Sequence, residues 1–161
     1  MTAFQERVGR VALQWMTGAN TVVYRLSNGR VAGRLPTGAP ICLLTSRGRR
    51  TGRARTVPLL YITHGDDEIV VVASHGGMSR HPAWYLNLHD DPRATVDIGP
   101  SRREMLARRT TATERAEIWP RLTAVYPHFD AYQRRTARRI PVLILSPVAD
   151  PPGRRPMHRG R

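Results

Sequence analysis

The densest group of chemically active side chains in this sequence is a basic stretch at residues 43–58, LLTSRGRRTGRARTVP. A guanidinium donates paired hydrogen bonds to phosphate or carboxylate, and clustered like charges repel each other unless an anion lies between them. The stretch therefore indicates an anionic ligand, with a solvated surface turn as the alternative. Gly48 and Gly52 would also let the backbone N–H groups of the turn face the same anion. The stretch has no acidic residue and five arginines: Arg47, Arg49, Arg50, Arg53 and Arg55.

This stretch is not a P-loop, because its two glycines are four positions apart and no Lys-Ser or Lys-Thr follows the second. Other reactive groups give weaker signals. The six histidines have no spacing typical of a zinc or iron site, and Cys42 is the only cysteine, so we expect no metal site and no internal disulfide. Cys42 lies in an apolar run and should be a buried, unreactive thiol. A serine nucleophile is unsupported, because no Gly-x-Ser-x-Gly elbow occurs.

Three further groups could contact a flat ligand. Ser74 follows an apolar run and precedes His75-Gly76-Gly77, so it can offer a hydroxyl and exposed N–H groups, although a capping role fits equally well. Trp84 and Tyr85 could stack on a heterocycle, whereas core packing is the usual fate of such a pair. A third group, spaced three apart on one predicted helix face, belongs either to the core or to a pocket wall: Tyr126, Phe129 and Tyr132.

The composition indicates one folded and strongly basic domain. The chain has 161 residues, 40% of them hydrophobic, which suits a single domain with a real core. Its 26 basic residues are all arginine, and the net charge of +14 attracts nucleic acid, acidic lipid or a polyanionic small molecule. Residues 1–20 lack the apolar segment of a signal peptide, and no apolar run has the length of a membrane span. We therefore expect a cytoplasmic protein, with contact to a membrane surface as an alternative.

The elements expected around these residues are mainly short strands. The basic stretch would join the first two strands, and residues 64–67 predict a hairpin turn between the second and third. Closely spaced strands joined by hairpins favour an antiparallel sheet or small barrel over a doubly wound fold. Apolar runs bounded by turn residues predict strands over 39–45, 56–63, 68–74, 94–98 and 140–146, with a weaker candidate over 101–111.

Helical spacing predicts helices over 2–16, 78–87, 113–126 and 129–138. The first of these packs on the domain or lies with its apolar face on an anionic membrane. The third is expected to begin with Ala112 or Thr113 near its cap and to kink or restart at Pro120. The proline-containing tail at 150–161 is expected to be disordered.

Several ordered blocks resemble the deazaflavin-dependent nitroreductase family, whose small proteins use coenzyme F-420, a deazaflavin. The blocks are SRGRRTGRARTVPLLY, then VVASHGGMSRHPAWYLNL with DDPRATVDIG, then ERAEIWPRLTAVYPHFDAYQRRTARRIPVLIL; NTVVYRLSNGRVAGRL is also similar. The likeness covers about residues 15–146. It implies an α+β, mainly β fold, a split β-barrel of about six antiparallel strands with C-terminal helices. The domain limits it suggests are an N-terminal amphipathic helix at 1–20, the barrel at 21–148 and a disordered basic tail at 149–161.

The resemblance also implies roles for individual residues. In the family the basic turn receives the phosphate and acidic tail of the coenzyme, which here implies Arg49, Arg50, Thr51 and Arg55, shaped by Gly48 and Gly52. The implied catalytic groups, which would hold the acceptor or supply a proton, are Ser74, Tyr126 and Tyr132. No metal is implied. Further coenzyme contacts are implied for Val57, Pro58, Val72, Ala73, Ser74, His75, Ala83, Trp84, Asn87 and Phe129.

The implied function is hydride transfer from reduced coenzyme F-420 to a flat, electron-poor acceptor, a quinone or nitroaromatic. Leu60 stands where a well-studied branch of the family has Tyr near the ring, Phe129 where Tyr also occurs, and His75 where Lys occurs. These departures bear on nitro reduction more than on coenzyme binding. The alternatives are a split-barrel reductase using flavin mononucleotide, a non-catalytic binder of the coenzyme or of lipid, and a nucleic-acid module suggested by charge alone. The expected partners are a small-molecule acceptor and a membrane surface at the N-terminal helix, without nucleic acid, in a monomer or homodimer.

Overall fold

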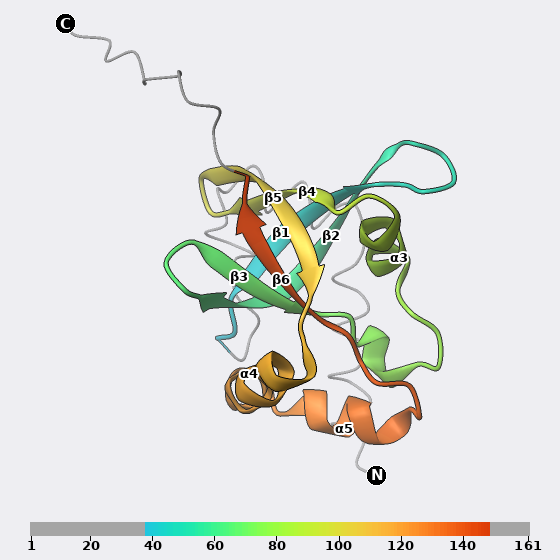
Figure 1. The fold of residues 1–161 in the computed structure, drawn as a ribbon, viewed down its shortest axis with the longest axis vertical. Helices are drawn as coiled ribbons and strands as arrows, with labels where there is room; N and C mark the ends of the chain where they lie inside the picture. Colours follow the sequence, from blue (N-terminus) through green and yellow to red (C-terminus); the bar gives the residue numbers. More distant parts are fainter. Residues whose placement is uncertain (1–37, 149–161) are drawn as a thin grey trace, which may run out of the picture.

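The computed structural model describes residues 38–148, which form a closed barrel of six antiparallel strands (Figure 1). The strand order around the barrel is β1-β2-β3-β6-β5-β4, and β4 closes it by pairing with β1. The expectation of a six-stranded antiparallel barrel is thereby confirmed. The helix predicted at 1–20 and the tail predicted at 149–161 lie outside the described residues. The strands are β1 (Ile41–Arg47), β2 (Ala54–His64), β3 (Glu68–Val72), β4 (Arg93–Ile98), β5 (Ser101–Arg109) and β6 (Val142–Pro147).

The first hairpin reaches further into the basic stretch than the apolar pattern predicts. The ladder between β1 and β2 continues past the hydroxyl pair of Thr45 and Thr56, 2.8 Å apart, to the register pair Arg47 and Ala54. Backbone pairing does not need apolar side chains, so a strand can extend beyond its hydrophobic run. The weakly predicted segment at 101–111 is also a strand, β5.

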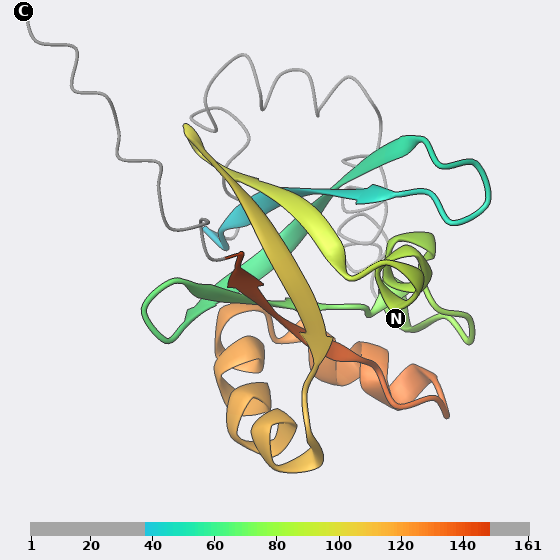
Figure 2. The ribbon, with the colours of Figure 1, turned by 45° about the horizontal axis from the view of Figure 1, so that its top comes forward.

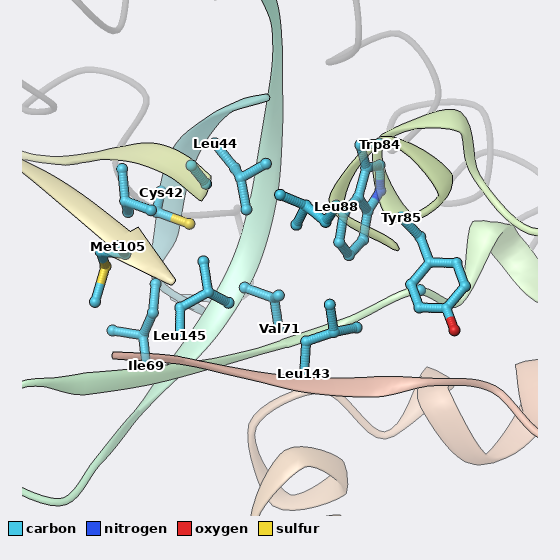
Figure 3. Close-up of a cluster of buried hydrophobic side chains, with 13 residues drawn as sticks. Cys42, Leu44, Ile69, Val71, Trp84, Tyr85, Leu88, Met105, Leu143 and Leu145 are labelled. Atoms are coloured by element: carbon cyan, nitrogen blue, oxygen red, sulfur yellow. The ribbon is translucent and has the colours of Figure 1, made fainter. Parts of the chain in front are cut away.

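The barrel interior is filled by residues that alternate along each strand (Figure 3). Cys42 and Leu44 of β1 point inward with every second residue of the neighbouring strands, and both are fully buried. Helix α3 (Ala83–Asp90) contributes Trp84, Tyr85 and Leu88 to the same cluster. The interior core thus fixes α3 to the barrel.

A second apolar cluster lies on the outer face of β3 and β6. Helices α4 (Ala112–Val125) and α5 (His128–Arg135) cover this face, as Figures 1 and 2 both show. Val70 and Val72 of β3 face these helices, whereas Val71 between them faces the interior. The run at Glu68–Val72 is therefore buried on both sides, as its sequence predicts.

The helix boundaries differ from the predicted ones for local reasons. Helix α3 starts five residues later than the predicted segment, because its N-cap, Pro82, has an extended backbone with a ψ of 150°. The 3-10 turn η1 (His75–Gly77) lies earlier in the same connection. The cap of α4 is Thr111, not Ala112 or Thr113: its hydroxyl accepts from the Glu114 N–H at 3.2 Å, and the Glu114 carboxylate accepts from the Thr111 N–H at 2.8 Å. The Thr-x-x-Glu pattern of such a capping box is visible in the sequence. The helix passes through Pro120 as one element, so no restart occurs there.

Candidate functional site

The hairpin between β1 and β2 projects from the barrel beside α3 (Figures 1 and 2). All five arginines of the basic stretch are exposed on it. None of the five forms an ion pair with another residue of the described range 38–148. Within that range no carboxylate neutralises their charge.

The turn at the end of this hairpin is built by its glycines. Gly52 has a φ of +68°, a conformation that costs other residues energy. A side chain on Gly48 would place its Cβ 3.0 Å from the Thr51 hydroxyl and 3.1 Å from the carbonyl oxygen of Arg53. A side chain at either glycine would therefore strain the turn, which gives both glycines the shaping role expected of them.

The backbone of the turn is occupied by its own hydrogen bonds. The Gly48 N–H donates to the Arg53 carbonyl at 2.8 Å, and the Thr51 and Gly52 N–H groups donate to the Gly48 carbonyl at 3.2 and 2.7 Å. The Arg53 N–H donates to the Thr51 hydroxyl at 3.3 Å. The prediction that these N–H groups cradle an anion is therefore wrong for most of the turn, because the N–H groups are already engaged. Side chains must supply the contacts to an anion.

Asn87 of α3 ties the basic turn to the barrel. Its Oδ1 accepts from the Arg49 N–H at 3.1 Å, and its Nδ2 donates to the Ser46 hydroxyl at 3.2 Å. A backbone N–H can donate only to the oxygen of the amide, so this orientation of the side chain is required. Asn87 is 6% exposed and Ser46 is 2% exposed. Asn87, implied as a coenzyme contact, is placed by these bonds to position the turn.

The connection after β3 carries the second part of the predicted site. His75, Gly76 and Gly77 all have positive φ, at 47°, 63° and 79°. Ser74 is half-buried. Neither its hydroxyl nor the N–H groups of Ser74, His75 and Gly76 donate to an acceptor within residues 38–148. A Cβ on Gly77 would lie 2.7 Å from the Tyr132 carbonyl oxygen, so η1 packs directly on α5. The turn therefore presents donors that no residue of 38–148 uses, on a backbone held against a helix.

The three spaced aromatic residues differ in burial. Tyr126 and Phe129 are 6% and 4% exposed and belong to the cluster between α4, α5 and the barrel. Tyr132 is half-buried at the edge of that cluster, with its hydroxyl 3.2 Å from that of Tyr126. Burial, followed by the contact with Tyr132, raises the pKa of Tyr126, so its hydroxyl stays protonated. The backbone of Tyr132 also lies against the turn after Ser74, since its carbonyl oxygen would be 2.7 Å from a Cβ on Gly77.

Several of the other implied coenzyme contacts are neighbours on one strand, and their side chains lie on opposite faces of the sheet. Val57 packs against the interior cluster while Pro58, the next residue of β2, lies on the opposite face. Val72 likewise faces the helices and Ala73 the interior. Trp84 packs edge-on against Tyr85 in the barrel core, with ring centroids 6.5 Å apart. Adjacent strand residues such as Val57 and Pro58, or Val72 and Ala73, thus present their side chains to different faces. Ala83, at the start of α3, is exposed.

Metal-binding, membrane-spanning and thiol chemistry gain no support in the described range. Residues 38–148 contain no group of three or more His, Cys, Asp or Glu that could hold a metal ion. None of the helices described there is long and apolar enough to cross a membrane. Burial raises the pKa of the Cys42 thiol to about 12, so it remains protonated.

Comparison with known proteins decides the family. The model of the F-420H(2)-dependent quinone reductase family matches residues 15–147. The chain belongs to this family. A Mycobacterium tuberculosis protein that is provisionally named an F-420H(2)-dependent quinone reductase is 43% identical over 108 residues, which are 67% of this chain and 90% of that protein. The resemblance seen in the sequence is therefore confirmed: this quinone reductase family member is an oxidoreductase of the class that uses coenzyme F-420.

Solved structures agree with this placement. One described as an F-420-H2 dependent reductase has a TM-score of 0.61 and 35% identity, covering 66% of this chain and 94% of its own. Another, described as a domain-swapped dimer, has a TM-score of 0.63 and 30% identity, covering 89% of this chain and 96% of its own. The family fold thus accommodates the barrel described above.

Proposed function

We propose that this chain reduces a quinone with reduced coenzyme F-420 and binds the anionic part of the coenzyme at the β1–β2 turn of a split β-barrel. The observation that carries the proposal is the unneutralised charge of that turn, with five exposed guanidiniums that form no ion pair within the described range. The family name supplies the coenzyme and the class of acceptor. A phosphate and carboxylate tail fits this donor set, because guanidiniums pair with both groups.

The binding contacts at the turn would come from side chains. Arg49 and Arg50, with Arg55, would donate to the phosphate and the acidic tail, since most N–H groups of the turn are engaged internally. A charge-assisted hydrogen bond contributes roughly 1.5–3 kcal/mol, and solvent screening at this exposed site favours the lower end. Asn87 would keep the turn in place during binding through its bond to the Arg49 N–H.

The reaction would take place near the Ser74 turn. The bound coenzyme supplies a hydride, and a quinone that accepts it also takes up one proton to become a quinol. The Ser74 hydroxyl and the N–H groups of His75 and Gly76 are donors that could hold a carbonyl oxygen of the acceptor. Tyr132 is half-buried and its backbone packs on this turn at Gly77, so it is our candidate for supplying or relaying the proton, while Tyr126 holds its hydroxyl. Catalysis would then rest on binding and alignment.

The oligomeric state of the protein is a separate part of the proposal. A related structure at 30% identity is described as a domain-swapped dimer, which supports a homodimer for this chain too. Light scattering coupled to size exclusion would test it, and a monomeric mass across the working concentration range would contradict it. Membrane contact through residues 1–20 stays a prediction, because those residues lie outside the described range.

A fluorescence titration with oxidised coenzyme F-420, run in parallel with flavin mononucleotide, tests the proposed function. We expect the deazaflavin to bind and the wild-type protein to reduce the soluble quinone menadione when given reduced coenzyme. Arg49→Ala and Arg50→Ala should each raise the Kd by about tenfold, the effect of 1.4 kcal/mol. The matched control is Arg103→Ala, which removes the same charge from a surface pair with Asp67. Tight binding of flavin mononucleotide alone, or an unchanged Kd in both turn variants, would overturn the assignment.

A further inference from the structure

Arg138, in the connection between α5 and β6, binds the chain between β3 and α3. Its Nε donates to the Met78 carbonyl at 2.8 Å, and its Nη2 donates to the Ser74 carbonyl at 2.8 Å and to the Ala73 carbonyl at 3.2 Å. Its Nη1 lies 3.2 Å from Nδ1 of His81. All three guanidinium nitrogens are therefore used on one loop, from partners 57 to 65 positions earlier in the sequence.

These bonds distinguish Arg138 from the arginines of the basic turn. Arg138 is half-buried and forms no ion pair with any residue between 38 and 148. A guanidinium has five N–H donors and no acceptor, and here at least four of these donors are directed at protein atoms. Since its nitrogen donors are engaged, Arg138 serves the loop and not an anion.

The contact with His81 fixes the state of that ring. Arginine can only donate, so Nδ1 of His81 must accept and its proton must lie on Nε2. Burial, then the charges of Arg138 and Arg109, lower the pKa of His81, which favours this neutral ring. The ring also packs on Tyr85, with centroids 4.8 Å apart. Through His81, the bonds of Arg138 thereby join the loop to α3.

The loop that Arg138 holds has a conformation that needs support. His75 has a φ of 47°, which is unfavourable for a residue with a side chain, and it is followed by two glycines with positive φ. Such a backbone persists where the surroundings fix it from several sides. Gly77 is held against α5, and Arg138 binds the carbonyls on either side of the turn, at Ser74 and at Met78.

We infer that Arg138 is a positioning residue that clamps both ends of the 74–78 turn, so that the Ser74 hydroxyl and the neighbouring N–H groups stay aligned with the acceptor. This inference rests on the proposed function, in which that turn contacts the reacting molecules. Arg138 itself touches neither coenzyme nor acceptor. Its loss should therefore lower the rate of quinone reduction much more than it weakens coenzyme binding at the basic turn.

Arg138→Ala and Arg138→Lys test the inference, with Arg139→Ala as the matched control. Arg139 is exposed and adjacent, so its replacement removes the same charge without removing the clamp. With menadione, we expect kcat to fall by about tenfold to a hundredfold in Arg138→Ala, since a displacement near 1 Å can cost that much. The Kd for oxidised coenzyme F-420 should change by less than about threefold, because the basic turn is unaltered. Guanidinium ion, well below denaturing concentrations, should restore part of the rate in Arg138→Ala, whereas Lys cannot span the same acceptors.

A readout independent of activity is hydrogen exchange at the Gly77 and Met78 amides, whose acceptors are the Ser74 and His75 carbonyls. Exchange there should accelerate in Arg138→Ala and stay unchanged in Arg139→Ala. If Arg138→Ala does not fold, Arg138→Lys carries the comparison. Unchanged kcat in a folded Arg138 variant would overturn the inference, whatever the exchange shows. An inactive wild-type protein that also fails to bind the coenzyme would instead overturn the proposed function, and the inference with it.

Discussion

Replacing Asn87 by leucine should weaken both the fold and the coenzyme site. Leucine has a similar size but cannot accept from the Arg49 N–H or donate to the Ser46 hydroxyl. The Arg49 N–H lies in an exposed turn and can be hydrated, which limits its loss to about 1 kcal/mol. The Ser46 hydroxyl is 2% exposed and would be buried without its partner, at a cost of about 1–3 kcal/mol. We expect a total of about 2–4 kcal/mol.

Urea unfolding followed by tryptophan fluorescence measures this change. With a slope of about 2 kcal/mol per molar urea, the middle of the usual range, the midpoint should fall by roughly 1–2 M. The Kd for oxidised coenzyme F-420 should rise by about tenfold, because a turn released from α3 no longer presents Arg49 in one place. Asn87→Asp is the matched control, since a carboxylate can accept from both the Arg49 N–H and the Ser46 hydroxyl.

A double variant sharpens the test. Removing both partners in Ser46→Ala with Asn87→Leu leaves no buried hydroxyl unpaired, so part of the lost stability should return. An unfolding midpoint of Asn87→Leu equal to that of the wild type would refute the energetic argument. A clear loss of stability with an unchanged Kd would refute the link between Asn87 and the coenzyme site.

Three other outcomes are expected. The buried Cys42 thiol, with its pKa raised to about 12, should react with a disulfide reagent only as fast as the protein unfolds; rapid stoichiometric labelling of native protein would contradict its burial. Hydrogen bonds from Arg108, and then from the Thr111 backbone, lower the pKa of Glu114 to about 2. The ionised carboxylate therefore contributes stability above about pH 4.5, and this contribution is lost as the pH falls towards 2. Glu114→Gln should flatten this acid dependence of the unfolding midpoint, and an unaltered profile would argue against the capping box. Gly77→Ala should lower the Tm more than Gly76→Ala, because both have positive φ but only the Gly77 side chain would meet a backbone carbonyl at 2.7 Å; equal losses would show that the contact with α5 is loose.

The sequence by itself determined the features that depend on neighbouring residues. Alternating apolar runs and glycine-containing turns predict the hairpins, and the arginines of residues 43–58 predict a basic turn between the first two strands. These predictions succeed because side-chain alternation and turn conformation are local properties of the chain. The likeness of ordered blocks added the barrel, the coenzyme and the family, which the comparisons confirm.

Tertiary structure alone decided which distant residues meet. The pairing of β1 with β4 closes the barrel, and it brings together segments about fifty positions apart that carry no mark of that pairing. The roles of Asn87 and Arg138 depend on acceptors and donors 38 to 65 positions away, so their residue types reveal nothing of those partners in advance. The division of Val57 from Pro58 also needed the register, since a strand turns adjacent side chains to opposite faces. Packing of α3 and α5 on the barrel sets these contacts, and packing is a property of the whole chain.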